Sequence, residues 1–340
     1  MLRLPRFQLR RPSTLDEALA WLAEAGAGGR LIAGGTDLVP NMKHELVTPD
    51  TVIALSAVRE LAGIRRQPDG DIVIGAMTTI AEIAASEELR AHAPSLAQAA
   101  SLVAGPQHRR MGTIGGNILL DTRCQWYNQT YFWRSAIGFC LKKDGTACHV
   151  VAGGSRCVAA ASNDTAPSLM TLGASLEIAS PHGRRQEPID QFWTHDGIHN
   201  HRLDDGEILV SVRIPQTPAG HRGAYGKLRD RGAIDYPLLG VAVRLDVDDE
   251  GIVQRSDVVL TALAAAPRRI ASARALLKGT RPGTSSFETQ VDGVADAAFR
   301  QCHPLENIPG DAGWRREMVR VYVRRTLAAA ALGGGPVHHV

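Results

Sequence analysis

The chain has 340 residues, of which 44% are hydrophobic and 21% are charged, and its formal net charge is +3 at pH 7. This composition is ordinary for a folded globular protein, and the length suffices for two or three domains. The small net charge and the lack of a basic tract argue against nucleic-acid binding. No apolar run approaches the roughly 20 residues of a membrane helix, and residues 1–9 are too short and too charged for a signal peptide. We therefore expect a cytoplasmic protein that binds neither nucleic acid nor membrane.

The first unit, residues 1–56, is predicted to alternate strands and a helix. Thr14 and Glu17 have the spacing of a capping box at the start of a helix. Short strands are predicted at 30–33 and near 52–55. The segment therefore forms a small α/β unit.

The second unit, residues 57–219, begins with a predicted strand at 72–77. Thr79 and Glu82 form a second predicted capping box, which opens helices that continue to Val103. After an interruption come a predicted helix at 167–172 and strands at 175–178 and 208–214. The interruption, at about 120–160, is rich in aromatic residues and has no clean periodicity, so it is predicted to be a long loop or insertion.

The third unit, residues 220–332, is predicted to have three strands followed by helices. The strands are expected at 224–229, 239–247 and 258–264, and the helices at about 267–277, 286–300 and 311–331. A tail at 333–340 contains Gly333-Gly334-Gly335-Pro336 and is predicted to be disordered.

Two glycine-rich segments follow predicted apolar elements. They are Ala33-Gly34-Gly35-Thr36-Asp37 and Thr113-Ile114-Gly115-Gly116-Asn117. Glycine lets the backbone turn sharply near a ligand, and the N–H groups of such a turn form a concave site for anions. The first segment is suited to a pyrophosphate, and the second adds hydroxyl and amide groups. Neither matches the G-x-G-x-x-G or P-loop pattern, so two plain tight turns are the alternative.

Six motifs occur in order along nearly the whole chain: Leu31-Ile32-Ala33-Gly34-Gly35-Thr36-Asp37-Leu38, Met42-Lys43, Thr113-Ile114-Gly115-Gly116-Asn117-Ile118, Ser162-Asn163-Asp164-Thr165-Ala166-Pro167, Gly206-Glu207-Ile208-Leu209-Val210-Ser211 and Tyr225-Gly226-Lys227-Leu228-Arg229. Together they resemble the flavin subunit of the xanthine dehydrogenase (molybdenum hydroxylase) family. The resemblance implies an α+β fold. It would consist of a two-part FAD-binding domain of the PCMH type and a C-terminal α/β domain of the CO dehydrogenase flavoprotein type. That second domain would combine a three-stranded antiparallel sheet with a helical bundle.

The same resemblance implies which residues bind FAD. The first loop, Leu31 to Leu38, would hold the pyrophosphate, and Thr113, Ile114, Gly115, Gly116 and Asn117 would line the other side of the cofactor. Asp164 would bond a polar part of FAD, Lys227 would lie near the isoalloxazine, and Val103 and Leu209 would pack on the cofactor. Other interpretations stand beside these: Asp164 as a helix N-cap, Lys227 as a solvated strand residue, and Val103 and Leu209 as ordinary core.

Four of the five cysteines lie in the insertion, as Cys124, Cys140, Cys148 and Cys157, with spacing C-x15-C-x7-C-x8-C. No C-x2-C pair occurs, so the spacing fits neither a zinc ribbon nor a ferredoxin run. Ordering a long irregular loop costs entropy, and a four-thiolate metal site would offset that cost. Four unrelated thiols are the alternative. Cys302 stands apart and is predicted to be structural.

The residues around these cysteines are more informative than the cysteine spacing alone. Asp121-Thr122-Arg123-Cys124-Gln125-Trp126-Tyr127-Asn128, residues 140–151 and Cys157 resemble the cysteine insertion in the β subunit of the 4-hydroxybenzoyl-CoA reductases, which most flavin subunits lack. The resemblance implies a [4Fe–4S] cluster on the four cysteines. Nearby aromatic residues would shield the cluster, or else form ordinary loop packing: Trp126, Tyr127, Phe132, Trp133 and Phe139. His149 would lie outside the ligand set.

The resemblance also implies partners. The molybdenum cofactor and two [2Fe–2S] clusters would sit on separate subunits of a heterotrimer, and a ferredoxin-like donor would feed this chain. We see no nucleophile elbow or paired carboxylates, so no catalytic residue is assigned here. Three alternatives are open: a related enzyme that oxidises an aldehyde or a heteroaromatic ring, a flavin subunit whose cysteines bind structural zinc, and a stand-alone flavin reductase or oxidase.

Overall fold

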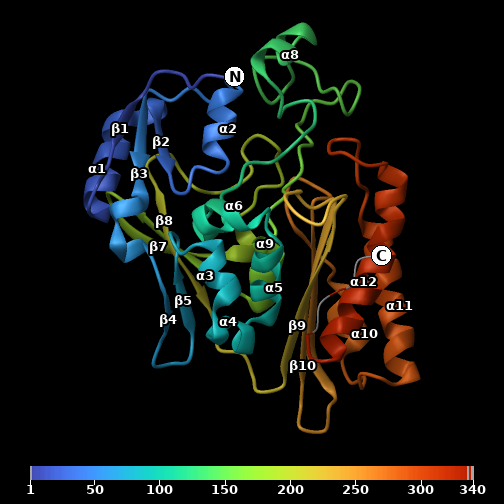
Figure 1. Cartoon of the computed structure of the whole chain (residues 1–340). Coiled ribbons are helices and arrows are strands. Elements are labelled where there is room, and N and C mark those ends of the chain that lie inside the picture. Colours follow the sequence, from blue (N-terminus) through green and yellow to red (C-terminus); the bar gives the residue numbers. More distant parts are fainter. Residues whose placement is uncertain (1, 335–336, 338–340) are drawn as a thin grey trace.

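The computed structural model describes residues 2–334 and 337 and contains three β-sheets (Figure 1). The N-terminal sheet is parallel, in the order β1-β3-β2. Its elements are β1 (Gln8–Arg10), α1 (Leu15–Ala25), β2 (Gly29–Ile32), α2 (Leu38–Lys43) and β3 (Thr51–Ala54). The predicted cap at Thr14 is half formed. Its Oγ1 accepts the N–H of Glu17 at 3.2 Å, but the Glu17 carboxylate bonds to Ser13 instead of Thr14.

The second sheet is antiparallel, in the order β4-β5-β8-β6-β7. Its strands are β4 (Ile64–Arg66), β5 (Ile72–Gly75), β6 (Ser175–Ser180), β7 (Gly183–Pro188) and β8 (Ile208–Ile214). The helices of this part are α3 (Ile80–Ala85), α4 (Glu87–His92), α5 (Pro94–Leu102), α6 (Pro106–Met111), α7 (Ile114–Ile118) and α9 (Thr165–Leu172). The predicted capping box of Thr79 and Glu82 is confirmed in full, since each residue accepts the other's backbone N–H.

The third sheet is antiparallel, in the order β12-β11-β10-β9. Its elements are β9 (His221–Leu228), β10 (Leu239–Val247), β11 (Val253–Thr261), β12 (Arg268–Arg269), α10 (Ser272–Leu277), α11 (Ser285–Gln301) and α12 (Ala312–Ala331). The three predicted strands are present. The helix predicted from residue 267 begins only at Ser272, because Arg268 and Arg269 pair with β11 as a short fourth strand.

The third sheet is covered on both faces. α12 packs on β9 and β10 from one side, whereas α5 and α9 of the second part pack on β9, β10 and β11 from the other. Figure 1 shows this sheet between the central helices and the red helices at the C-terminal end. Most side chains of the three long strands are therefore buried, and Lys227 of β9 lies at the junction between parts.

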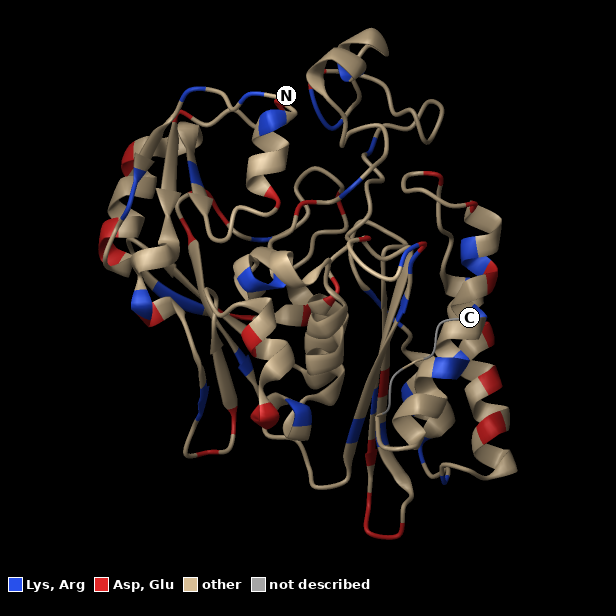
Figure 2. Cartoon of the chain, viewed as in Figure 1, with Lys and Arg blue, Asp and Glu red and all other residues tan. Residues whose placement is uncertain are grey.

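The outer helices carry charges of both signs. Figure 2 shows mainly acidic residues along α11 and mainly basic residues along α12. Arg320 pairs with Asp296 at 2.8 Å and Arg324 with Asp292 at 2.6 Å. Within the described ranges, no helix is long and apolar enough to cross a membrane.

The insertion contains a helix that the sequence did not predict, α8 (Tyr131–Ala136). It begins at Thr130, whose side chain accepts the N–H of Trp133 at 3.3 Å. Of the predicted tail, residues 335, 336 and 338–340 lie outside the described residues. Its described part packs on the fold: the Gly334 carbonyl accepts a hydrogen bond from Gln98, and Val337 is buried.

Candidate cofactor sites

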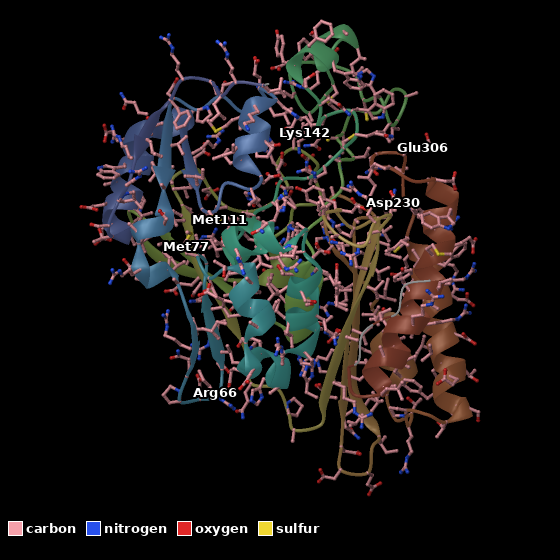
Figure 3. All side chains as sticks on the ribbon, in the orientation of Figure 1. Arg66, Met77, Met111, Lys142, Asp230 and Glu306 are labelled. Atoms are coloured by element: carbon pink, nitrogen blue, oxygen red, sulfur yellow. The ribbon has the colours of Figure 1, made fainter. Side chains whose placement is uncertain are left out.

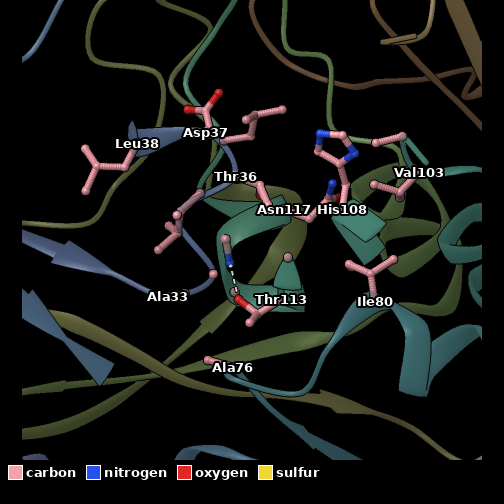
Figure 4. Close-up of a pocket in the computed structure, with 18 of the residues that line it drawn as sticks. Ala33, Thr36, Asp37, Leu38, Ala76, Ile80, Val103, His108, Thr113 and Asn117 are labelled. Carbon is pink, nitrogen blue, oxygen red and sulfur yellow. Dashed lines mark hydrogen bonds between the residues drawn. The ribbon is translucent and has the colours of Figure 1, made fainter. Parts of the chain in front are cut away.

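Both glycine loops face one cavity of about 390 Å³ (Figure 4). Every residue predicted to bind FAD lines this cavity except Ile114 and Lys227. Cavities of this size commonly hold small-molecule ligands, with apolar walls and a few polar groups. Here Val103 and Leu209 supply apolar wall, while Thr36, Asp37 and Asn117 supply polar groups.

The first glycine loop lies directly against the two residues that precede the second loop, Met111 and Gly112. A Cβ on Gly34 would lie 1.8 Å from the carbonyl oxygen of Met111, so only glycine allows this approach. Gly35 has φ +71°, a left-handed conformation that also favours glycine. Gly34 therefore allows the two loops to approach each other closely, and Gly35 allows the turn that follows.

The second glycine loop is fixed from within and from α9. The Thr113 Oγ1 accepts the N–H of Gly116 at 3.1 Å, which is the dashed line in Figure 4. The Asn117 Oδ1 accepts the N–H of Thr165 at 3.1 Å and its hydroxyl at 2.6 Å. Residues of a ligand-facing loop are thus tied to the start of a buried helix.

Asp164 reaches the cavity from a buried ionic cluster. One carboxylate oxygen accepts the Tyr225 hydroxyl at 2.8 Å, and the other accepts the Lys227 ammonium at 2.9 Å. The ammonium also donates to the Leu102 carbonyl at 2.9 Å. Burial raises the pKa of the Asp164 carboxyl, and Lys227 opposes that rise.

The structure separates two of the predicted site residues from the cavity wall. Ile114 points into the apolar core and is fully buried there, so only its backbone shares the loop. Lys227 is also fully buried and lies behind Asp164, so the solvated alternative is wrong. Asp164 does occupy the N-cap position of α9, as the alternative predicts, but its side chain makes no capping hydrogen bond and bonds to Tyr225 and Lys227 instead.

The sequence did not single out several residues of the cavity wall. They include Ala104, His108, Ile234, Asp235 and Tyr236. Ile234 has φ +74°, and its N–H donates to the Ala104 carbonyl at 3.1 Å. The only local signal is the non-periodic 229–238 segment between two strands; its contact with the glycine loops arises from the tertiary fold.

The four cysteines of the insertion surround a second, much smaller cavity of about 20 Å³. Trp126, Tyr127, His149 and neighbouring apolar residues complete its wall. Burial raises the pKa of the Cys124 thiol to about 11, and it also raises the pKa of the Cys157 thiol. Over residues 2–334 and 337, no group of three or more His, Cys, Asp or Glu side chains is placed to hold a metal ion. The thiols share one cavity without forming a compact single-ion site.

Cys302, in contrast, lies in the core of the third part. It is buried among apolar residues, and burial raises its thiol pKa to about 11. A thiol with so high a pKa is a poor nucleophile at neutral pH. This agrees with the structural role predicted for it.

A third cavity, of about 640 Å³, lies between the other two. It shares Ser162, Ile234 and Tyr236 with the cavity of the glycine loops and Cys124 with the cysteine cavity. The glycine loops and the cysteine insertion are therefore neighbours in space.

Comparisons with known proteins agree with this architecture. A family model described as the FAD binding domain in molybdopterin dehydrogenase matches residues 5–217, and one described as the CO dehydrogenase flavoprotein C-terminal domain matches residues 223–330. The carbon monoxide dehydrogenase medium chain of Hydrogenophaga pseudoflava is 31% identical over 326 residues, covering 96% of this chain and 97% of the relative. The aldehyde oxidoreductase FAD-binding subunit of Escherichia coli is 31% identical over 307 residues, covering 88% and 91%. A solved structure of carbon monoxide dehydrogenase from Hydrogenophaga pseudoflava aligns with a TM-score of 0.78 at 32% identity, covering 96% of this chain and 98% of that one.

The fold and the two glycine loops define an FAD-binding protein with a two-part flavin domain and a C-terminal flavoprotein domain. The chain belongs to the FAD-binding subunits of the xanthine dehydrogenase and CO dehydrogenase family, the molybdenum hydroxylases. The predicted fold class is thereby confirmed.

Proposed function

We propose that this chain binds FAD and a [4Fe–4S] cluster and relays electrons within a 4-hydroxybenzoyl-CoA reductase-like enzyme. The partners would be a molybdenum subunit, a [2Fe–2S] subunit and a ferredoxin-like donor, all in the cytoplasm. The overall reaction takes up two electrons and two protons, breaks the phenolic C–O bond of an aromatic acyl-CoA and releases water. The division into 1–56, 57–219 and 220–332 belongs to this proposal.

The observation that carries the proposal is the convergence of Cys124, Cys140, Cys148 and Cys157 on one cavity. These residues come from a segment without strands and lie up to 33 positions apart in the sequence (157 − 124 = 33). A four-iron cluster is bulkier than a single ion, so its ligands can surround it without forming a single-ion site. Four thiolates around an apolar, aromatic wall fit such a cluster.

The side chains of this chain would hold and position the cofactors. The loops around Gly34 and Gly116 would bind the pyrophosphate side of FAD, and Val103 and Leu209 would pack on its ring. Asp164, hydrogen-bonded to Lys227, would orient a polar edge of the cofactor. FAD and the cluster supply the redox chemistry, and the protein tunes and places them.

Anaerobic purification followed by iron, sulfide and zinc analysis tests the cluster. We expect about four iron and four sulfide atoms per chain. Substituting any of the four cysteines, as in Cys140→Ser, should abolish them, whereas Cys302→Ser should not. Stoichiometric zinc without iron would support the structural-zinc alternative. Bound FAD without any metal would contradict the proposed cluster.

The similarity to the aldehyde oxidoreductase subunit favours one other candidate, a flavin subunit of an enzyme that oxidises an aldehyde. Electrons would then leave through this chain. Turnover by the purified complex separates the two: reduction of 4-hydroxybenzoyl-CoA by a low-potential donor supports the first proposal. Aldehyde oxidation without that activity supports the second.

A further inference from the structure

The first flavin loop continues directly into a short helix, and the cysteine insertion contacts both ends of this helix. The loop ends at Asp37, and α2 runs from Leu38 to Lys43. The Asp37 Oδ2 accepts the side-chain amide of Asn41 at 2.8 Å, which fixes the carboxylate on α2. Its other oxygen faces the insertion.

Arg123 makes the first of these contacts. Its guanidinium donates to the Asp37 Oδ1 at 2.8 Å, and both side chains are less than one-third exposed. The same guanidinium lies 4.1 Å from the centroid of the Tyr236 ring. Partly desolvated, hydrogen-bonded arginine–carboxylate pairs are stronger than surface pairs. Arg123 directly precedes Cys124 in the chain, so this contact joins the flavin loop to a predicted cluster ligand.

Arg134 makes the second contact. This arginine of α8 is 1% exposed and donates to the carbonyls of His44 and Glu45, just after α2, at 3.2 and 3.0 Å. A buried arginine needs such acceptors because the desolvation of its charge is costly. Glu45 has φ +55°, a conformation that presents these carbonyls to the guanidinium.

Apolar packing completes the connection. Leu46 follows the same turn and is buried in a cluster with Cys124, Tyr127, Cys140 and Ala159. The segment from Asp37 to Leu46 therefore touches the flavin cavity at one end and two of the four cysteines at the other.

We infer that this segment, 37–46, couples the two cofactor sites, so that loading the cluster strengthens FAD binding and FAD binding favours cluster retention. The inference rests on the proposed function, since it requires a cluster on the insertion. An ordered insertion holds the side chains of Arg123 and Arg134 in place. These two side chains hold α2 in position, and α2 in turn holds the loop from Gly34 to Asp37. Thermodynamic linkage makes the effect reciprocal.

The test compares FAD dissociation constants of the full chain with and without its cluster. FAD is titrated by flavin fluorescence into cluster-loaded protein and into protein stripped by anaerobic chelation. For the wild type we expect FAD to bind about tenfold more tightly to the loaded chain. In Arg123→Met the ratio of the two constants should fall toward one, and Arg134→Met should act in the same direction.

Arg156→Met is the matched control. Arg156 is exposed and directly precedes Cys157, as Arg123 precedes Cys124, so its loss should leave the ratio near the wild-type value. A ratio of one in the iron-loaded wild type, or a wild-type ratio in Arg123→Met, would overturn the coupling alone. A wild type that never holds iron would overturn the proposed cluster and the coupling with it. Circular dichroism of each variant separates loss of coupling from loss of fold.

Discussion

At the scale of single residues, the buried charges carry the most information about the flavin site. Asp164, Tyr225 and Lys227 are each at most 3% exposed, and their polar atoms bond to one another and to the Leu102 carbonyl. Paired charges are tolerated in a protein interior when their hydrogen bonds are made. The ammonium behind the carboxylate therefore offsets part of the cost of burying its charge beside the cavity.

Lys227→Met should destabilise the apo-protein by about 3–5 kcal/mol, because it leaves the Asp164 carboxylate buried without its counter-ion. The double variant Asp164→Asn/Lys227→Met should lose less, since no charge is then left buried. Urea unfolding measures both. Lys278→Met, at an exposed position, is the control and should change the free energy of unfolding by less than about 0.5 kcal/mol.

The same variant should change the dependence of stability on pH. Burial raises the Asp164 pKa above its ordinary value of 3.8, so its contribution to stability is full below that value and is lost as the pH rises through the folded pKa. Without Lys227 the pKa rises further, and the loss extends to higher pH. The deficit of Lys227→Met against wild type should therefore be larger at neutral pH than at about pH 4. A constant deficit would show that Asp164 is not the titrating group.

Gly34→Ala should weaken FAD binding by about tenfold or more, because overpacking of this kind costs on the order of 1–3 kcal/mol. The added Cβ would meet the Met111 carbonyl at 1.8 Å and push the two loops apart. Flavin content and fluorescence titration measure the loss. Gly232→Ala is the control, since a Cβ there meets nothing within 4 Å. Equal affinity in both variants would contradict the role of the loop contact.

At the scale of elements, the insertion is held by polar contacts to its surroundings more than by a large core. Lys142 donates to the Gly197 carbonyl at 2.8 Å, and Gln125 donates to the Glu306 carbonyl at 2.8 Å. Lys142 and Glu306 are labelled among the side chains in Figure 3. Its apolar cluster is small and contains the cysteines themselves. Such a segment should depend on the proposed iron–sulfur cluster for order.

Removal of the cluster by chelation should therefore make the insertion sensitive to protease. We expect cleavage within 125–156 to accelerate by about tenfold or more, since local opening exposes the backbone. Mass spectrometry of the fragments locates the cuts. Cleavage at the exposed turn between β6 and β7 is the internal reference and should keep its rate. Uniform acceleration at both places would indicate global unfolding instead.

At the scale of the whole molecule, the flavin cavity is built from all three parts of the chain. Gly34 belongs to the first, Asn117 and Asp164 to the second, and Ile234 and Tyr236 to the third. A ligand in this cavity contacts segments that do not follow one another in the sequence. Binding of such a ligand should therefore stabilise all three parts against unfolding as one unit.

Saturating FAD should raise the free energy of unfolding by about 2.7 kcal/mol at a free concentration of 100 times its Kd. Differential scanning calorimetry should show one shifted transition, not a shift confined to one part. Gly34→Ala should show a smaller shift at the same FAD concentration. Separate transitions, of which FAD moves only one, would contradict a cavity shared by all parts.

Much of the fold was predictable because local patterns govern it. The strands at 208–214 and 239–247 have the predicted bounds, and the Thr79–Glu82 box lies within a few residues of sequence. α8 was missed because its apolar and aromatic residues show no clear period, and its start depends on Thr130 alone. β12 was missed because two arginines become a strand only when β11 lies beside them.

The sequence by itself determined the glycine loops, their order and the spacing of the cysteines, since turns and motifs are local. The tertiary structure alone decided which distant groups meet. It placed Lys227 behind Asp164, Tyr236 against Arg123, and the cysteines around one cavity. These contacts depend on how the sheets and helices pack, because burial and charge pairing join residues that the chain keeps far apart.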